Sequence, residues 1–325
     1  MLENLADRRP WTGLAAVVVA AATLAACAPA RPVSFPATPA VAVPTDLRVR
    51  TEGRMRTVPI EEYVLGAILS EVTPVGEAPD VVGRIYELQS IVARTYAVAH
   101  LGRHRAEGFD MCETTHCQIY QPARIASSRF TATARAAVAR TTGRILTYGA
   151  RPAEAFFHAD CGGSTAAAED VWGGRAVPYL RAVVDELPAA THRPWRADLA
   201  VDEVRRALNA DERTAVGRRL DAIEVLARDD SGRAAGLGVR GERSYTVRGD
   251  VLRAVLNRTF GARAVQSTRF DLARQGTRYI LTGTGFGHGV GLCQRGAIAR
   301  LRRGESVGGV LDTYFPGSRV GVAGS

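Results

Sequence analysis

Residues 58–72, VPIEEYVLGAILSEV, have the hydrophobic spacing of an α-helix. At about 100° per residue, one face carries an apolar set made of Ile60, Val64 and Ala67. Glu71 falls in the middle of that face, whereas Glu61 and Glu62 point away from it and are expected to be solvated. The pattern therefore predicts a helix that holds one carboxyl group against the apolar interior.

Further periodic segments follow along the chain. A second helix is predicted over residues 87–100, a polar helix over 131–140, and the loop TPVGEAPD of residues 73–80 separates the first two helices. Residues 187–219 are charged and helix-prone, and we place a domain sub-boundary there. Short strands with Gly-containing turns are expected around Ile145, Phe156 and Leu180, at 223–247 and at 279–281. This mixture predicts an α+β fold, with a helix-rich catalytic part and a strand-rich second part.

The N-terminus has the pattern of an export signal. Arg8 and Arg9 precede an apolar run, Leu14 to Ala26, that is too short for a full membrane span. The run ends in LAAC, which resembles the lipobox of bacterial lipoproteins with Cys27 as the lipidated residue; the alternative is an ordinary signal peptide with a chance cysteine. We therefore expect residues 1–27 to direct export and lipid anchoring in the membrane. The Pro- and Ala-rich residues 28–46 predict an extended tether.

Composition adds a weak indication about partners. The formal net charge of the 325 residues is +9, and the basic residues are scattered arginines, with no lysine in the chain. Long-range attraction to an anionic wall polymer or to phospholipid fits this charge, although such a bias more often reflects genome composition. Nucleic acid is excluded as a partner, because no basic stripe with interleaved aromatic residues occurs and the chain has an export signal.

The segment at residues 283–296, GTGFGHGVGLCQRG, is unusually rich in glycine. It follows a strand-like YILT and precedes a helix-like AIARLRR, but its spacing fits no GxGxxG motif and the lysine of a P-loop is absent. Dense glycines indicate positive φ angles or a close approach of another chain segment. Two interpretations follow: a groove floor with His288 held over it, or a tight structural loop with an incidental histidine.

These residues carry a resemblance to the SpoIID family. The segment Gly287 to Gly291, followed by Gln294 and Gly296-Ala297, resembles the family's GHGVG…Q.GA signature, which is also met in amidase-enhancer relatives. Other blocks match in the family's order: Tyr63-Val64 to Ser70-Glu71, QSIVARTY at 89–96, Phe157-His158 through CGGST at 161–165 to EDVW at 169–172, PYL at 178–180, and SGRAAGLGVRG with Val247-Arg248-Gly249 and Arg253. The resemblance spans roughly residues 47 to 318, which we take as one SpoIID-like domain.

The resemblance implies a peptidoglycan lytic transglycosylase that acts on glycan strands stripped of their stem peptides. The family's catalytic glutamate corresponds to Glu71, although this chain reads Ser-Glu-Val-Thr-Pro at 70–74 where the family has a motif like Ser-Glu-Met-Pro. A carboxyl group on an apolar helix face is partly desolvated, which keeps it protonated closer to neutral pH, as a general acid requires. The alternative is a structural glutamate at a helix end, or one paired with Arg94.

The implied mechanism needs one carboxyl group. A hydrolase would ordinarily use a second carboxylate, and Glu169 and Asp170 are available for that role, although loop and turn positions describe them as well. A transglycosylase protonates the leaving oxygen and then closes a 1,6-anhydro ring with the sugar's own C6 hydroxyl. No cofactor is needed for this chemistry.

A loop rich in cysteine and histidine suggests a metal site or a disulfide. The candidate ligands are His104, Cys112, His116 and Cys117, with Cys161 as an alternative ligand or disulfide partner. The resemblance implies a zinc ion bound by Cys and His near this region, and we expect this ion to be structural. A cysteine nucleophile at Cys293 beside His288 is disfavoured, because no third group that would orient the histidine is evident.

The remaining candidates are polar residues expected to line a groove for sugar hydroxyls, each of which could instead be structural: Arg94, His158, Gly163, Ser164, Thr165, Tyr179, His288 and Gln294. Rival functions are a non-catalytic amidase enhancer that binds glycan, and a zinc-dependent wall hydrolase. The expected partners are peptidoglycan glycan strands and an N-acetylmuramoyl-L-alanine amidase. The expected location is the membrane surface that faces the periplasm or cell wall.

Overall fold

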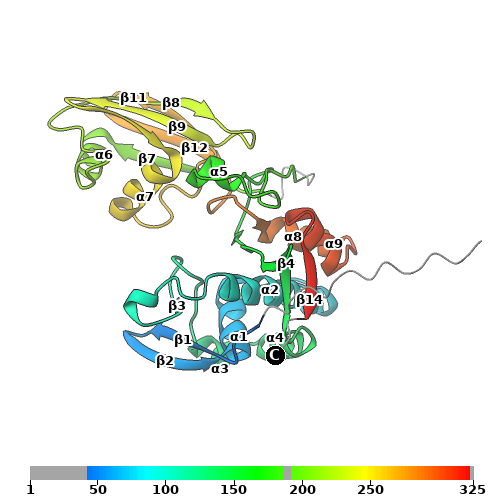
Figure 1. The fold of residues 1–325 in the computed structure, drawn as a ribbon. Coiled ribbons are helices and arrows are strands. Elements are labelled where there is room, and N and C mark those ends of the chain that lie inside the picture. The colour runs from blue at the N-terminus through cyan, green and yellow to red at the C-terminus, as the bar shows by residue number, and fades with distance from the viewer. Residues whose placement is uncertain (1–41, 186–191, 323–325) are drawn as a thin grey trace, which may run out of the picture. The chain divides into compact units, whose positions relative to one another are not determined.

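The computed structural model describes residues 42–185 and 192–322. The predicted signal peptide, the lipobox Cys27 and most of the 28–46 tether lie outside the described residues. Within those two ranges, no helix combines the length and the apolar character needed to cross a membrane. The described chain mixes helices with small sheets, so the predicted α+β class is confirmed (Figure 1).

We call residues 42–185 and 292–322 the helical part. It contains two long helices, and its short strands pair with one another in small sheets (Figure 1). Its elements in chain order are β1 (Asp46–Thr51), β2 (Arg54–Pro59), α1 (Ile60–Glu71), α2 (Pro79–Ala99), η1 (Arg105–Glu107), β3 (Met111–Cys112), α3 (Ala123–Ser127), α4 (Thr131–Arg140), β4 (Arg144–Tyr148), β5 (Arg151–Pro152), β6 (Phe157–His158), α5 (Ala168–Trp172), β13 (Leu292–Cys293), α8 (Gln294–Arg302), α9 (Val307–Tyr314) and β14 (Arg319–Val322).

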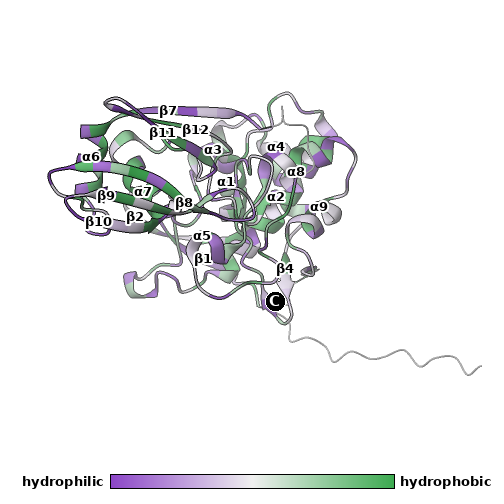
Figure 2. Cartoon of the chain, turned by 90° about the horizontal axis from the view of Figure 1, so that it is seen from above, coloured by the Kyte–Doolittle hydropathy of each residue, from purple (hydrophilic) through white to green (hydrophobic). Residues whose placement is uncertain are grey.

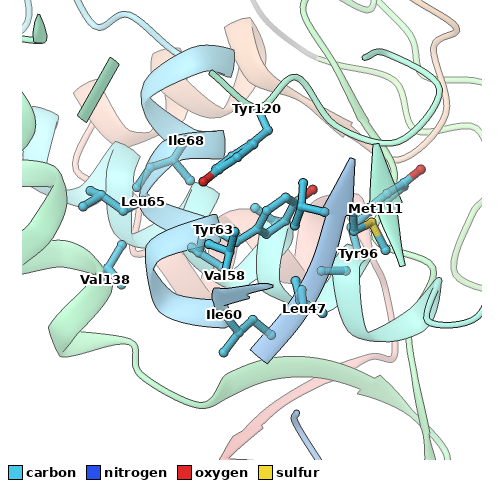
Figure 3. Packing of buried hydrophobic residues seen from close by; sticks show 14 of the residues in the cluster. Leu47, Val58, Ile60, Tyr63, Leu65, Ile68, Tyr96, Met111, Tyr120 and Val138 are labelled. Carbon is cyan, nitrogen blue, oxygen red and sulfur yellow. The ribbon is translucent and has the colours of Figure 1, made fainter. Parts of the chain in front are cut away.

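Helix α1 is buried on nearly all sides rather than on one face. Leu65 and Leu69, on the side away from Ile60 and Val64, are buried as well. In Figure 3 the side chains around α1 pack against β1 and the neighbouring helices. Because a helix that is apolar all round must be enclosed, α1 lies inside the helical part, and its polar residues are confined to Glu61, Glu62 and the last turn.

Helix α2 separates two hydrophobic cores. It begins at Pro79, earlier than predicted, because proline suits the first turn of a helix, where its missing N–H is not needed. One side of α2 packs with α1 and the other packs with α8 and α9, and the residues on the two sides are Val82, Tyr86, Ala93 and Ala97 against Val81, Ile85, Leu88 and Val92. The predicted helix at 131–140 is confirmed as α4.

Two parallel strand pairs bring distant segments together in the helical part. Strand β3 pairs with β1, so that Cys112 lies opposite Arg50. Strand β13 pairs with β6, so that Cys293 lies opposite His158. Strand β14 pairs with β4 and continues the fold to residue 322, beyond the predicted end at 318.

We call residues 192–291 the strand-rich part. It has its own hydrophobic core, and α6 and α7 lie on one side of its strands (Figure 1). Along β8 and β9 the residue colours of Figure 2 change repeatedly between hydrophobic and hydrophilic, as expected for strands with one face on a core. Its elements are β7 (Pro194–Ala200), α6 (Val201–Asn209), β8 (Leu220–Arg228), β9 (Ala234–Gly241), β10 (Ser244–Arg248), α7 (Gly249–Phe260), β11 (Phe270–Gln275) and β12 (Arg278–Thr284).

The predicted helix-prone segment at 187–219 is wrong in its first part. Residues 194–200 form strand β7, which pairs antiparallel with β12 along its whole length. Trp195, Ala197 and Leu199 alternate with exposed residues and face the core. Pairing with β12 supplies backbone hydrogen bonds that the local sequence does not reveal, and helix α6 follows directly after the strand.

Candidate functional site

Glu71 is the last residue of helix α1, and its side chain is largely shielded from solvent. The backbone N–H of Ile119 donates a hydrogen bond of 2.7 Å to Glu71 Oε1. Burial raises the pKa of Glu71 from 4.5 to about 7, and the hydrogen bond from Ile119 opposes this only in part. Near neutral pH the carboxyl group is therefore present in both forms, so it can donate a proton and afterwards accept one.

The segment 117–121 crosses helix α1 and fixes the position of Glu71. Gln118 Nε2 donates to the hydroxyl of Tyr63 at 3.3 Å, and the N–H of Gln121 donates to Ser70 Oγ at 3.0 Å. The crossing is close because residue 66 is glycine: a Cβ at this position would lie 2.5 Å from a ring carbon of Tyr120. These contacts hold the N–H of Ile119 beside the carboxyl group.

Arg94, predicted to line a groove, is fully buried and bound inside the fold. Its Nε donates to Glu61 Oε1 at 2.9 Å, and a second contact joins Nη2 to the other carboxylate oxygen. Its Nη1 also donates to the carbonyl oxygens of Ser90 and Arg144. Glu61 is therefore paired rather than solvated, and this guanidinium neutralises Glu61 instead of Glu71. Arg94 links α1, α2 and β4 within the helical part.

His104, Cys112, His116 and Cys117 come together in one cluster, with one potential ligand atom of each within 4.8 Å of the others. The two sulfur atoms are 3.1 Å apart and belong to unbonded thiols. Strand β3 carries Cys112 into the cluster, and the loop that follows it carries the other cysteine and His116. Cys117 directly precedes Gln118, so the cluster and the Glu71 contact share one loop.

The donor set of this cluster matches the one that zinc uses in structural sites, with two sulfur and two imidazole ligands. His104 Nδ1 lies 2.5 Å from Glu107 Oε1, while Nε2 lies 3.2 Å from the Cys117 sulfur. A carboxylate bound to one ring nitrogen is the usual way to orient a histidine ligand toward a metal. Burial and the charge of Arg103 lower the pKa of His116, which favours the neutral imidazole that binds metals.

The Gly-rich loop lies against the His158 segment through the β6–β13 pair. His158 Nδ1 donates to the carbonyl oxygen of Val290 at 3.2 Å, and the N–H of Val290 donates to His288 Nδ1 at 3.0 Å. The two imidazole rings have their centres 5.4 Å apart. The loop thus holds both histidines in place through its own backbone.

Both histidines are neutral at physiological pH. Burial, followed by the charge of Arg253, lowers the pKa of His288 to about 3, and burial lowers the pKa of His158 well below its usual value. The ring of Trp172 lies 5.2 Å from that of His288 and is 36% exposed. Trp172 and His288 therefore place two uncharged aromatic rings next to the Gly-rich loop, and aromatic faces of this kind pack well against the apolar faces of sugars.

Several other predicted groove residues are bonded within the fold. Ser164 and Thr165 are buried, and their hydroxyl groups bond the 181–183 backbone, including an N–H from Val183 to Thr165 Oγ1 at 2.8 Å. The hydroxyl of Tyr179 accepts the N–H of Glu154 at 2.9 Å. Gly163 accepts the N–H of Asp185 through its carbonyl group. These residues shape the loops that carry His158 and Cys161.

Gln294 lies close to the C-terminal end of α1. It lines a small cavity together with Val72, the residue after Glu71, and with Gln89 of α2. The Nε2 atoms of Gln89 and Gln294 are both buried without a partner among the described residues. The surface of the cavity itself is almost wholly apolar.

Arg233 has a structural role that no sequence motif predicted. This fully buried residue of the strand-rich part donates to the carbonyl oxygens of Cys161 at 2.7 Å and Ser164 at 2.8 Å. Gly289, with a φ of +90°, leaves the space that the guanidinium occupies, which explains one glycine of the loop. The one indication of this role in the sequence was that Arg233 lies inside the SGRAAGLGVRG block, which matches the family.

The fold and the site define an α+β protein in which a carboxyl group with a raised pKa lies beside a cluster of Cys and His residues. Residues 50–148, which include Glu71 and the cluster, match the sequence model of SpoIID, described as stage II sporulation protein. Residues 189–291 match a domain of unknown function, DUF8618. The chain belongs to the SpoIID family, and its role is associated with the cell wall.

Individual relatives agree with this assignment. An uncharacterized protein of Brachyspira hyodysenteriae is 30% identical over 79% of this chain, which covers 65% of that relative's length. Stage II sporulation protein D of Bacillus subtilis is 27% identical over 83% of this chain and 76% of its own length. The amidase enhancer of the same organism is 24% identical over 71% of this chain, which spans only 37% of that relative.

Proposed function

We propose that this protein is a lytic transglycosylase that cleaves denuded peptidoglycan glycan strands, with Glu71 as its general acid and base. The observation that carries the proposal is the carboxyl group of Glu71, whose pKa burial raises to about 7. Support comes from the relative named stage II sporulation protein D and from the position of Glu71 inside the matched SpoIID segment.

The proposed reaction needs one carboxyl group and no water. Protonated Glu71 gives its proton to the glycosidic oxygen as the bond to C1 of N-acetylmuramic acid breaks. The carboxylate then removes the proton of the same sugar's C6 hydroxyl, and O6 forms the new bond to C1. The products are a free 4-hydroxyl group and a 1,6-anhydro ring, and Glu71 regains its proton. The N–H of Ile119 orients the carboxyl group throughout.

We propose that the cluster of His104, Cys112, His116 and Cys117 binds a structural zinc ion. Bound zinc would add stability to the loop that carries these ligands, because it would crosslink His104 to the segment 112–117. A more stable loop would also hold Glu71 more firmly, because Cys117 is followed by Gln118, which bonds Tyr63 of α1. Four protein ligands leave no open position for a reacting water, which argues against a zinc hydrolase.

The second candidate function is a non-catalytic amidase enhancer. The observation that favours it is the similarity to the protein of that name. In this case the aromatic rings of Trp172 and His288 would bind glycan and present it to an N-acetylmuramoyl-L-alanine amidase, while Glu71 would be structural. The amidase is a proposed partner under both functions, because stem peptides must be removed before a denuded strand exists.

We further propose that the protein is exported and anchored through lipid at Cys27, since the LAAC sequence ends an apolar run. This location gives the domain access to peptidoglycan. The tether at 28–46 would then set its reach from the membrane surface.

Incubation of the purified protein with denuded glycan strands tests the proposal. Soluble fragments that end in 1,6-anhydro-N-acetylmuramic acid are the expected result. Glycan retention without any new fragment would favour the enhancer. Fragments with reducing ends would replace the transglycosylase by a hydrolase.

A further inference from the structure

Two cysteines outside the Cys and His cluster meet inside the fold. Cys161 follows strand β6 and Cys293 ends strand β13, and both are 0% exposed. The N–H of Cys161 donates to the Cys293 sulfur at 3.1 Å. The two sulfur atoms and a carboxylate oxygen of Asp185 lie within 4.8 Å of one another. Cys161 was predicted to be an alternative partner of Cys112 or Cys117, but those two cysteines belong to the other core of the helical part.

The two cysteines lie at the entry and exit of the strand-rich part. They are 132 residues apart in the chain, and the DUF8618 match at 189–291 falls entirely between them. The parallel β6–β13 pair already brings the two crossing points together. A covalent bond between the sulfurs would therefore link the segment that enters the strand-rich part to the segment that leaves it.

The surroundings of the pair favour neutral sulfur over a metal site. Asp185 is already bound by the hydroxyl of Tyr314 at 2.6 Å and by Arg300 at 3.1 Å. Arg233 is fully buried and donates to the carbonyl oxygen of Cys161. The guanidinium groups of Arg300 and Arg233 therefore oppose the binding of a metal cation at the two sulfurs. The charge of Asp185 is already balanced by Arg300.

The resting thiol pair is also a poor nucleophile. The neighbouring Cys293 sulfur and burial raise the pKa of Cys161 far above its usual value, and the Cys293 sulfur accepts N–H groups from both Cys161 and Gly296. No solvent reaches either atom in the folded protein. Catalysis and redox sensing both require access that this site does not have.

We propose that Cys161 and Cys293 form a structural disulfide in the exported protein. The two thiols lose two protons and two electrons, one sulfur–sulfur bond forms, and a protein dithiol oxidase in its disulfide form takes up the electrons and protons to become a dithiol. The bond forms during folding, while both thiols are still accessible. The inference rests on the proposed export, because disulfides persist in oxidising compartments, and it does not depend on whether the protein cleaves glycan.

The test is peptide mapping of the full chain, purified from an exporting bacterium and alkylated under denaturing conditions without reductant. We expect a crosslinked peptide pair that contains residues 161 and 293 and is lighter by two hydrogens than the sum of its thiol forms. The same spectrum reports removal of the signal peptide. Alkylation of both thiols in a processed chain, a crosslink of Cys161 to Cys112 or Cys117, or a metal bound at Cys161 and Cys293 would each overturn the proposal. Free thiols in an unprocessed chain would overturn export together with it.

Thermal unfolding gives an independent readout. Because the crosslink closes a long loop, reduction should lower the Tm of the wild type by roughly 10 °C. The double variant Cys161→Ala/Cys293→Ala should show no response to reductant, whereas Cys112→Ser/Cys117→Ser should keep the response, since its disulfide is intact. An equal response in the wild type and the Cys161→Ala/Cys293→Ala variant refutes the disulfide. Glycan cleavage is assayed separately, so loss of the proposed enzymatic function would leave these results unchanged.

Discussion

The substitution Glu71→Gln separates a catalytic from a structural role of this residue. The amide oxygen of glutamine can still accept the N–H of Ile119, which donates at 2.7 Å to Glu71 Oε1. The side chain keeps its size, so packing at the end of α1 is preserved. Glutamine cannot donate a proton as an acid, and loss of general acid and base assistance typically lowers a rate by roughly 10²–10⁴-fold.

The same substitution has a distinctive effect on stability. Burial raises the pKa of Glu71 from 4.5 to about 7, so its neutral form is favoured in the folded state. Below pH 4.5, the pKa of this group in the unfolded chain, the group is protonated in both the folded and the unfolded state and does not lower the free energy of unfolding. As pH rises from 4.5 to about 7 the folded protein loses stability, by at most about 3–4 kcal/mol, since one pKa unit corresponds to roughly 1.4 kcal/mol.

The Gln variant lacks this penalty. It should match the wild type in free energy of unfolding near pH 4.5 and exceed it at pH 8, while its cleavage rate falls. The wild-type rate should also decline above pH 7, as the acid form of Glu71 disappears. Glu62→Gln is the matched control, because Glu62 is an exposed residue of the same helix and its substitution changes the net charge equally.

The assays are denaturant unfolding at the two pH values and quantification of anhydro-ended fragments from denuded glycan. A Gln variant that cleaves at nearly the wild-type rate would refute the assignment of Glu71 as the acid. Equal stability of variant and wild type at pH 8 would refute the raised pKa. Reducing ends from the wild type would show hydrolysis, and Asp170 would be the next carboxylate to substitute.

Three further predictions concern the loop and the anchor. Gly66→Ala should destabilise the protein by about 1–3 kcal/mol and reduce cleavage, because the new Cβ would lie 2.5 Å from the ring of Tyr120. Gly83→Ala on α2 is its control, since the nearest atom lies 3.6 Å away on a flexible arginine, and unchanged unfolding of the Gly66 variant would contradict the close crossing. Elemental analysis should find one zinc per chain and none in Cys112→Ser, with a lower Tm for that variant; metal-free native protein would contradict the site. Cys27→Ala should release the protein from the membrane fraction, and full membrane retention of its processed chain would contradict the lipobox.

The sequence alone determined the features that depend on local periodicity. The helices predicted within 58–72 and at 131–140 follow from spacing, because side chains three and four residues apart share a face wherever a helix packs. The ordered motifs likewise identified the SpoIID resemblance. Proximity in the chain was enough to group His116 with Cys112 and Cys117, since residues of one short loop cannot lie far apart.

Contacts between residues far apart in the chain could not be predicted from local patterns. Glu61 was predicted to be solvated, yet it binds Arg94, 33 residues away, and Cys161 lies beside Cys293 rather than beside the loop cysteines. Strand β7 exists because β12, whose paired residues lie 78 to 90 positions further along the chain, offers it hydrogen bonds. Such contacts depend on how the cores pack the elements together, and the free energy that selects them comes from burial over the whole domain, which no local pattern of residues contains.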